Sequence, residues 1–363
     1  MVVMVMKQIA QISFFLGSSI LAPVSLAQNI QPMVFSHGEW EIACSNIGTC
    51  RAAGFQSENT DEDLQPASIL ITRKAGERQP VKIEYLLSND EELSIKDPIR
   101  LWLNGQDYGV VSSPKNTEEL LSGEFNGKQV QALLKLANQN VKIEFKNKTE
   151  HWIVSDAGMT AVLLKMDDFQ KRIGTIGALI RKGTKNETGI LKPQPKTIVK
   201  RVKTDEKEYL TLAPHSPQYN SVLSSLKTAK TKQNGADDNC EGTYDSDQDG
   251  YNFGNIQLYK LSHQRVLATM LCWRGAYNAG YGAWVLNESL QGPAVLVTDS
   301  MTDLSSGELY ASHKGRGLGD CWSHEQWIWN GQNFIHTEEG WTGVCKGFVG
   351  GAWSLEKIET DVR

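Results

Sequence analysis

The stretch WIWNGQNFIH, residues 327–336, places Asn330-Gly331 between two apolar runs. Asn-Gly is a strong hairpin signal because both residues of a type I′ turn need positive φ. If these two residues alone form the turn, Trp329 pairs with Gln332. The aromatic residues of the two strands then share one face of the hairpin: Trp327, Trp329 and Phe334.

The whole C-terminal part continues this pattern of short strands separated by turn residues. Its apolar runs are rich in β-branched and aromatic residues, and seven of the ten Trp residues lie here. Regularly spaced short strands predict antiparallel sheets packed as a sandwich or a barrel. The expected strands are 255–262, 265–273, 282–287, 294–299, 307–314, 326–330, 333–339 and 351–358.

The N-terminal part also favours strands, with one or two helices among them. A second Asn-Gly pair, Asn104-Gly105, predicts another hairpin. In 127–140, apolar residues recur at spacings of three and four, which predicts an amphipathic helix. The segment MTAVLLKMDDFQKRIGTIGALIRKG is expected to be partly helical, with Asp167 or Asp168 near the helix N-terminus.

These patterns predict a mainly β (α+β) chain with two antiparallel β-rich domains, at 28–183 and 236–363. Between them, 184–235 is rich in Lys and Pro, which predicts a basic linker. The C-terminal domain is acidic, with 17 Asp/Glu against 8 Lys/Arg from Asp237 onward. The net charge of −5 at pH 7 gives no overall attraction to nucleic acid, so no nucleic-acid partner is expected.

The first 27 residues have the pattern of a cleavable export signal. Lys7 precedes a short apolar run, and the small residues Ser25 and Ala27 stand at positions −3 and −1 before Gln28. Ser, Gly and Pro residues interrupt the run, which argues against a membrane span of about 20 unbroken apolar residues. We therefore expect 1–27 to be a signal peptide cleaved after Ala27, a periplasmic location, and no membrane span in the mature chain.

Six cysteines follow the signal, and an even number predicts disulfides in an oxidising compartment. Cys44 and Cys50 lie on opposite sides of a turn, where a disulfide can bridge a hairpin. Cys321 and His324 are spaced like half a zinc site, but no second half follows. A Cys240–Cys272 bridge would close a loop around an acidic turn, and Cys321 and Cys345 flank the hairpin at 327–336. The expected disulfides are therefore Cys44–Cys50, Cys240–Cys272 and Cys321–Cys345, which also keeps every bridge within one proposed domain.

Several longer motifs carry a family resemblance. They are GEWEIACSNIGTCRAAGF near the start of the mature chain, and DDNC, CWRGAYNAGYGAWV, KGRGLGDCW, WIWNGQNFIHT and GGAWSL in the C-terminal part. Together they resemble domain-of-unknown-function family 1176, exported proteins of Gram-negative bacteria. Through Trp40, Cys44 and the later helix, the N-terminal half also resembles the invasion-associated locus B family. The resemblances imply an envelope location and imply no activity.

One acidic turn, DSDQDG, matches part of a calcium-binding loop. Asp245, Asp247 and Asp249 are followed by Gly250, as at positions 1, 3, 5 and 6 of such a loop. Position 12 is Ile256, where a bidentate Glu is expected, and no helical pattern flanks the turn. A solvated acidic turn is therefore favoured, with weak calcium binding as the alternative, and no other cofactor is expected.

Aromatic residues among glycines form the candidate ligand-binding surface. In GAYNAGYGAW, the rings of Tyr277, Tyr281 and Trp284 can stack on a sugar or hold a cationic peptide if they are exposed. In KGRGLGDCW, Arg316 stands in a Gly-rich loop whose N–H groups can bind an anion. The favoured alternatives are core packing for the aromatic residues and a tight turn before Cys321 for the loop.

The sequence offers no catalytic motif, since GxSxG and HExxH are absent and the His residues are not clustered. Binding is therefore the predicted role, with a peptide, a glycan or an envelope protein as partner. An inhibitor of a lytic enzyme is one form of it, because an acidic, disulfide-bonded domain complements a cationic enzyme. The alternatives are a cell-envelope hydrolase that uses carboxylate or His residues of the C-terminal domain, and a structural envelope protein.

Overall fold

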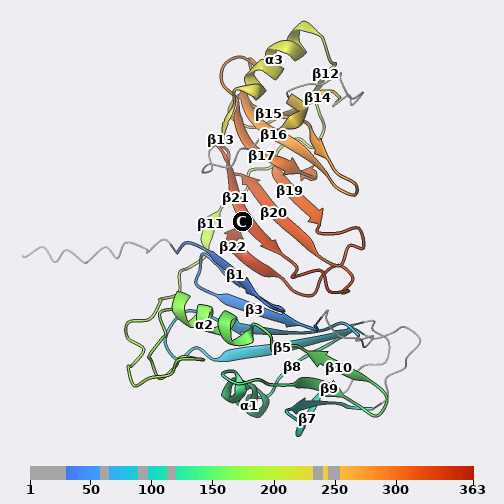
Figure 1. Ribbon diagram of the computed structural model, residues 1–363. Coiled ribbons are helices and arrows are strands. Elements are labelled where there is room, and N and C mark those ends of the chain that lie inside the picture. The colour runs from blue at the N-terminus through green and yellow to red at the C-terminus, as the bar shows by residue number, and fades with distance from the viewer. Residues whose placement is uncertain (1–29, 58–64, 89–96, 113–119, 232–239, 244–253) are drawn as a thin grey trace, which may run out of the picture.

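The computed structural model of the 363-residue chain describes residues 30–57, 65–88, 97–112, 120–231, 240–243 and 254–363 (Figure 1). The predicted signal peptide and the acidic turn with Asp245, Asp247 and Asp249 lie outside the described residues. The described residues form four sheets and three α-helices, which confirms the mainly β class. None of the four sheets closes into a barrel.

Six antiparallel strands in the order β1-β2-β3-β4-β5-β8 form the first sheet. Nearly all side chains of β2, β3 and β4 are buried, because both faces of this sheet are covered. Their sequences accordingly read as almost continuous apolar runs. The bounds are β1 (Met33–His37), β2 (Trp40–Cys44), β3 (Cys50–Phe55), β4 (Ala67–Arg73), β5 (Val81–Ser88) and β8 (Leu120–Glu124).

The second sheet has the order β10-β9-β6-β7. One apolar core contains residues from both sheets and both N-terminal helices, among them Trp40, Leu101, Leu133 and Met166. Burial of these side chains holds the N-terminal half together. The bounds are β6 (Ile99–Leu103), β7 (Gln106–Ser112), α1 (Gly127–Leu136), β9 (Ile143–Lys146), β10 (His151–Val154) and α2 (Met159–Phe169).

The hairpin predicted at Asn104-Gly105 is confirmed. Leu103 pairs with Gln106, so the turn has two residues, and both have positive φ, 50° and 78°. The side chain of Asn104 is occupied elsewhere, since it accepts a hydrogen bond from the N–H of Lys142 at 2.8 Å. The Asn-Gly pair therefore forms the tight turn that its dihedral preferences favour.

The expectation that Asp167 or Asp168 stands near a helix N-terminus is wrong. Helix α2 begins at Met159, and both Asp residues lie at its C-terminal end. Asp167 is buried and accepts hydrogen bonds from the N–H groups of Leu179 and Ile180 at 2.7 and 2.9 Å. The carboxylate thus fixes the chain that follows the helix, a role that helix-start preferences do not predict.

The C-terminal half contains two six-stranded sheets, in the orders β11-β22-β21-β20-β19-β18 and β12-β14-β15-β16-β17-β13. The second of them packs against α3. Their bounds are β11 (Thr197–Val199), β12 (Leu210–Leu212), α3 (Pro217–Lys227), β13 (Lys230–Thr231), β14 (Ile256–Lys260), β15 (Arg265–Arg274), β16 (Ala279–Asn287), β17 (Val295–Met301), β18 (Asp303–Ser305), β19 (Glu308–Lys314), β20 (Trp322–Trp329), β21 (Phe334–Trp341) and β22 (Leu355–Val362).

The segment 184–235, expected to be a linker, instead supplies parts of both C-terminal sheets. Strand β11 pairs with β22, and β12 pairs with β14. Val222 and Leu226 of α3 are buried in the C-terminal core. Within the described part of this segment, only Lys227 and Lys230 lie in a helix or strand, so the Lys-rich composition marks the connections between these elements and not a linker as a whole. The division of the chain into two domains stays a prediction.

The hairpin at 327–336 forms, but its predicted register is wrong. Trp329 pairs with Phe334 and not with Gln332, so the connection has four residues. The side chain of Asn330 accepts hydrogen bonds from two N–H groups further along this connection, at 2.9 and 2.8 Å. Because the register moves by two residues, the side chains keep their faces. The rings of Trp329 and Phe334 accordingly lie 5.2 Å apart between centroids.

Residues 342–354, between β21 and β22, cover the outer face of the first sheet. Phe348 is fully buried in an apolar cluster with Ala53, Phe55 and Leu70 of that sheet. In Figure 1 this end of the C-terminal half lies next to the N-terminal strands β1 and β3. Apolar burial of this kind joins the two halves in one folded structure.

Polar contacts reinforce the same junction. Glu41 accepts hydrogen bonds from the indole N–H of Trp341 at 2.8 Å and from the N–H of Val344 at 2.7 Å. Burial raises the pKa of Glu41, although both hydrogen bonds lower it. Arg51 forms an ion pair with Glu359 at 2.9 Å. The buried carboxylate of Glu41 is thus satisfied by donors from the other half of the chain.

Candidate functional site

Three loops at one end of the C-terminal strands carry the predicted residues Tyr277 and Arg316. They connect β15 to β16, β19 to β20, and β21 to β22. We call them the loop end, which comprises residues 275–278, 315–321 and 342–354.

Hydrogen bonds hold the first of these loops to the second. The side chain of Asn278 donates to the carbonyl oxygen of Lys314 at 2.9 Å and accepts from its N–H at 3.0 Å. The hydroxyl of Tyr277 donates to the carbonyl oxygen of Gly315 at 3.3 Å. These contacts fix Tyr277 beside the Gly-rich loop that contains Arg316.

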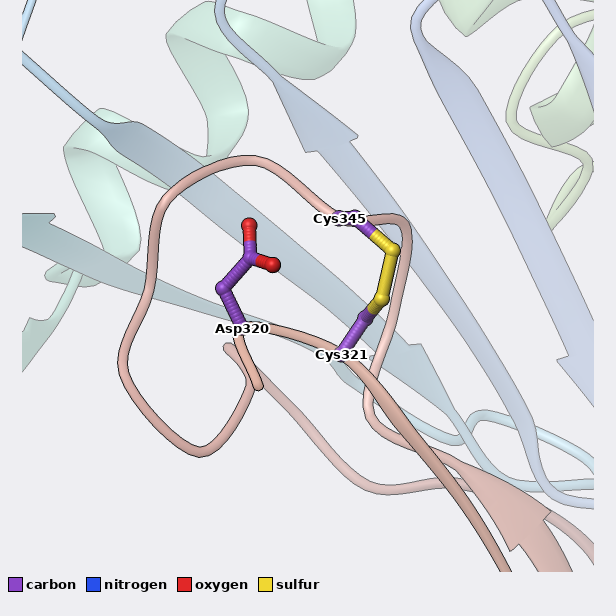
Figure 2. A group of neighbouring side chains, drawn as sticks. All are labelled: Asp320, Cys321 and Cys345. Atoms are coloured by element: carbon purple, nitrogen blue, oxygen red, sulfur yellow. A yellow bond between two sulfur atoms is a disulfide. The ribbon is translucent and has the colours of Figure 1, made fainter. Parts of the chain in front are cut away.

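A disulfide joins the second loop to the third. Cys321 is bonded to Cys345, as Figure 2 shows, and the N–H of Gly350 donates to the carbonyl oxygen of Gly319 at 3.0 Å. The six cysteines are paired throughout as the sequence predicts: Cys44–Cys50, Cys240–Cys272 and Cys321–Cys345.

Asp320 supplies the main polar contact inside the loop end. Its carboxylate accepts two hydrogen bonds from the Arg316 guanidinium, at 2.7 and 2.5 Å, and one from the N–H of Gly347 at 2.7 Å. The hydrogen bond from Arg316 is the main reason that the pKa of Asp320 lies below its ordinary value. Arg316 therefore serves first as an internal partner, and the Gly-rich loop is a tight, cross-linked turn.

The side chains that the loop end presents to solvent are apolar. Leu318 is 79% exposed and Val349 is 76% exposed, the two highest values for large apolar residues in the described chain. Their neighbours Gly319 and Gly350 are hydrogen-bonded, so the two side chains stand on adjacent segments. Exposed apolar groups gathered on a fixed backbone are typical of a surface that binds another macromolecule.

The predicted aromatic surface is only partly present. Tyr277 is 47% exposed and Tyr281 is 37% exposed. Trp284, by contrast, is buried in the C-terminal core with Cys272 and Leu286. Trp284 is therefore not part of a surface site, and for this residue the alternative of core packing is correct. Leu318 and Val349 were missed, although each stands next to glycine in a loop, where an apolar side chain has no strand face to bury it.

The described residues place Asp320 near both sulfur atoms of the Cys321–Cys345 disulfide (Figure 2). This group does not have the donors for a metal site, because zinc binds thiolates and these sulfur atoms form a disulfide. The carboxylate is also occupied by Arg316 and Gly347. The half zinc site considered for Cys321 and His324 is excluded for the same reason.

A groove of about 510 Å³ lies where β1 and β2 approach β20, β21 and β22. Three carboxylates line it, which is the feature that a hydrolase would need. Glu41 is occupied by Trp341 and Val344, as described above. Glu325 lies 3.0 Å from Nε2 of His336, and Glu339 forms an ion pair with Lys357. Each carboxylate of the groove thus has a partner within the protein.

Among the residues that the structure describes, no helix combines the length and the apolar character needed to cross a membrane. The family model described as "Protein of unknown function (DUF1176)" matches residues 34–358, which include both halves. The uncharacterized protein YpfG of Escherichia coli (strain K12) is 22% identical over 352 residues, covering 88% of this chain and 91% of that protein. No solved structure matches the chain significantly. The resemblance to the invasion-associated locus B family stays a prediction.

Proposed function

The chain belongs to the DUF1176 family of proteins of unknown function, and we propose that this member is an exported protein that binds another protein of the cell envelope through its loop end. The observation that carries the proposal is the exposure of Leu318 and Val349 on a backbone cross-linked by a disulfide. A fixed loop loses little conformational entropy when it binds, and burying its aliphatic groups is favourable.

The nature of the exposed side chains favours a protein as partner over a glycan. Sugars bind to flat aromatic faces with hydrogen-bonding groups around them. Leu318 and Val349 offer neither, and the core position of Trp284 removes the largest ring from the predicted glycan surface. Branched aliphatic side chains fit an apolar pocket of a folded protein or an apolar peptide segment.

Three disulfides support an oxidising location such as the periplasm. An inhibitor of a lytic enzyme is the specific form of the proposal, with the loop end inserted into a cleft of the enzyme. The excess of Asp and Glu in the C-terminal part would then attract a cationic enzyme and raise the association rate.

The alternatives of a hydrolase and of a structural protein have less support. The carboxylates of the groove are already paired with Trp341, His336 and Lys357. A structural protein without a partner at the loop end has no need of exposed Leu318 and Val349. Both alternatives stay open as predictions, and the variants below separate them from binding.

The test compares proteins captured from a periplasmic extract by the wild-type chain and by a Leu318→Ser, Val349→Ser double variant. The matched control is Ile176→Ser, which changes an apolar residue that is 66% exposed in the N-terminal half. We expect mass spectrometry to identify a partner that is retained by wild type and the control and lost by the double variant. The same partner captured equally by all three proteins would refute the role of the loop end.

A further inference from the structure

Three potential metal ligands come together on neighbouring strands of the first C-terminal sheet, on the strand segments that adjoin the loop end. His324 lies on β20, Glu338 on β21 and Glu356 on β22. His324 pairs across the sheet with Gly340, and Gly340 pairs with Glu356. The strand labels in Figure 1 show β20, β21 and β22 side by side. His324 and Glu356 therefore flank a glycine in one row across three strands.

The ligand atoms of this group are close to one another. The Nε2 atom of His324 lies 3.2 Å from Oε1 of Glu356 and 3.5 Å from Oε1 of Glu338. One ligand atom from each residue lies within 4.8 Å of the others. His324 and Glu356 are partly buried and Glu338 is exposed, so the group is open to solvent on one side.

The glycine in the middle of the row keeps the space between the ligands open. A Cβ atom at position 340 would lie 2.8 Å from Nε2 of His324 and 2.7 Å from an Oε atom of Glu356. Both distances are shorter than a van der Waals contact. Any residue other than glycine at position 340 would therefore occupy the point toward which His324 and Glu356 converge.

Within the group itself, two carboxylates face one imidazole. Glu359, the acidic residue opposite Glu338, is paired with both Arg51 and Lys196. Glu338 and Glu356 both lie close to the imidazole of His324. Ser354 also donates a hydrogen bond to Glu356, and the charge of Lys196 acts on Glu338. Two carboxylates at this distance repel each other, and a divalent cation bound between them and to the neutral imidazole would remove that repulsion.

We infer that His324, Glu338 and Glu356 form a binding site for one divalent transition-metal cation, with Zn²⁺ as the probe. One imidazole nitrogen and two carboxylate oxygens are a ligand set that Zn²⁺ accepts, with a further position left for water. The imidazole makes a transition metal a better match than Ca²⁺ or Mg²⁺, which prefer oxygen ligands. This site does not depend on the proposed binding role of the loop end.

The experiment uses the full chain, with its disulfides intact and freed of metal with EDTA, titrated with ZnCl₂ in a calorimeter. We expect one strong site per chain in the wild type. His324→Ala, Glu338→Gln and Glu356→Gln should each weaken Zn²⁺ binding by about tenfold or more, since each removes one ligand. Gly340→Ala should weaken Zn²⁺ binding as well, because the added methyl group would push the side chains of His324 and Glu356 apart.

The matched control is Glu325→Gln, which lies on the same strand as His324 but on the opposite face of the sheet. Its Zn²⁺ affinity should stay close to that of the wild type, because Glu325 acts on His324 only through its charge and supplies no ligand. Zn²⁺ should also raise the thermal unfolding midpoint of the wild type and of Glu325→Gln, and leave that of His324→Ala unchanged. Equal Zn²⁺ affinity in the wild type and His324→Ala, or no binding to the wild type, would overturn the assignment.

Discussion

Two regions of the C-terminal half present opposite chemistry to solvent. At the loop end, the polar groups are paired inside the protein and the exposed side chains are the aliphatic Leu318 and Val349. On the face of β20, β21 and β22, two carboxylates share one imidazole and the exposed groups are charged. Where the polar groups of a surface are already hydrogen-bonded within the protein, burial of apolar area supplies the favourable free energy of binding. Where a cluster carries more negative than positive groups, binding of a cation supplies it.

The two regions also differ in how they are held. The loops have no strand pairing of their own and depend on a disulfide, on Asp320 and on the junction with the N-terminal half through Glu41. The ligands on the strands are positioned by the sheet itself. Changes to the cross-links should therefore disturb the loop end and leave the strand face intact. The four predictions that follow test how the loop end is held.

The largest effect is expected from removing the Cys321–Cys345 disulfide by Cys321→Ala with Cys345→Ala. The two residues are 24 positions apart, so the bridge restricts the unfolded chain and the free energy of unfolding should fall by about 3 kcal/mol. Urea denaturation measures the loss. The comparison variant, Cys44→Ala with Cys50→Ala, removes a bridge between residues only 6 apart and should lose about 2 kcal/mol. A larger loss for the shorter bridge would contradict the loop-entropy explanation.

Glu41→Ala should have the next largest effect. It leaves the indole N–H of Trp341 and the N–H of Val344 without their acceptor at the junction. The raised pKa of Glu41 indicates that burial of its carboxylate is itself unfavourable, which offsets part of the loss. We expect a decrease of about 2 kcal/mol in the free energy of unfolding.

Urea denaturation also serves for this variant, and Glu84→Ala is the control, because Glu84 lies on β5 and makes only an ion pair with the exposed Lys82. That control should change stability by less than about 1 kcal/mol. If Glu41→Ala proves as mild as Glu84→Ala, the junction does not support the loop end.

Asp320→Asn should lower stability by about 1 kcal/mol at neutral pH, a modest value because Arg316 is partly exposed. The pKa of Asp320 is lowered in the folded state, mainly by Arg316. A carboxyl group whose pKa is lowered in the folded state stabilises the fold at pH values above its unfolded-state pKa, here 3.8. This stabilisation is lost as the pH falls through the folded-state pKa.

The difference between the wild type and Asp320→Asn should therefore be largest near pH 7 and shrink below pH 3.8. Unfolding free energies of both proteins across this pH range provide the measurement. A difference that stayed constant down to the lowest pH would show that the charge of Asp320 is not what stabilises the turn.

The two Asn-Gly hairpins show how far the sequence predicts the fold. Both hairpins form, as the shared signal predicts. At Asn104 the side chain bonds to a neighbouring loop and the two-residue turn results. At Asn330 the side chain caps its own connection, which lengthens it to four residues. The dipeptide predicts a hairpin, but the partners of the Asn side chain, which lie outside the motif, determine the register.

The sites were less predictable than the strands. His324, Glu338 and Glu356 come from three strands, and only their register brings them together. For this reason, sequence spacing related His324 only to Cys321 and to neither of the two Glu residues. Trp284 was misplaced in the candidate surface, because alternation along a strand does not show which of its faces is exposed. Its burial depends on the packing of the whole C-terminal core.

The smallest effect on stability is expected from the residues that matter most for the proposed function. Leu318→Ser with Val349→Ser should change the free energy of unfolding by less than about 0.5 kcal/mol, because both side chains are exposed and support no packing. Phe348→Ala, next to Val349 in the same loop, is the contrasting control. Phe348 is fully buried, and its truncation should cost about 3–5 kcal/mol.

The same urea denaturation experiment measures both variants. A loss above about 1 kcal/mol for the double variant would mean that Leu318 and Val349 stabilise the fold, and capture experiments could then no longer assign them to binding. Unchanged stability together with loss of a captured partner would separate the two roles within one loop. Phe348 would then anchor the loop to the first sheet, and Val349, one residue further along, would contact the partner.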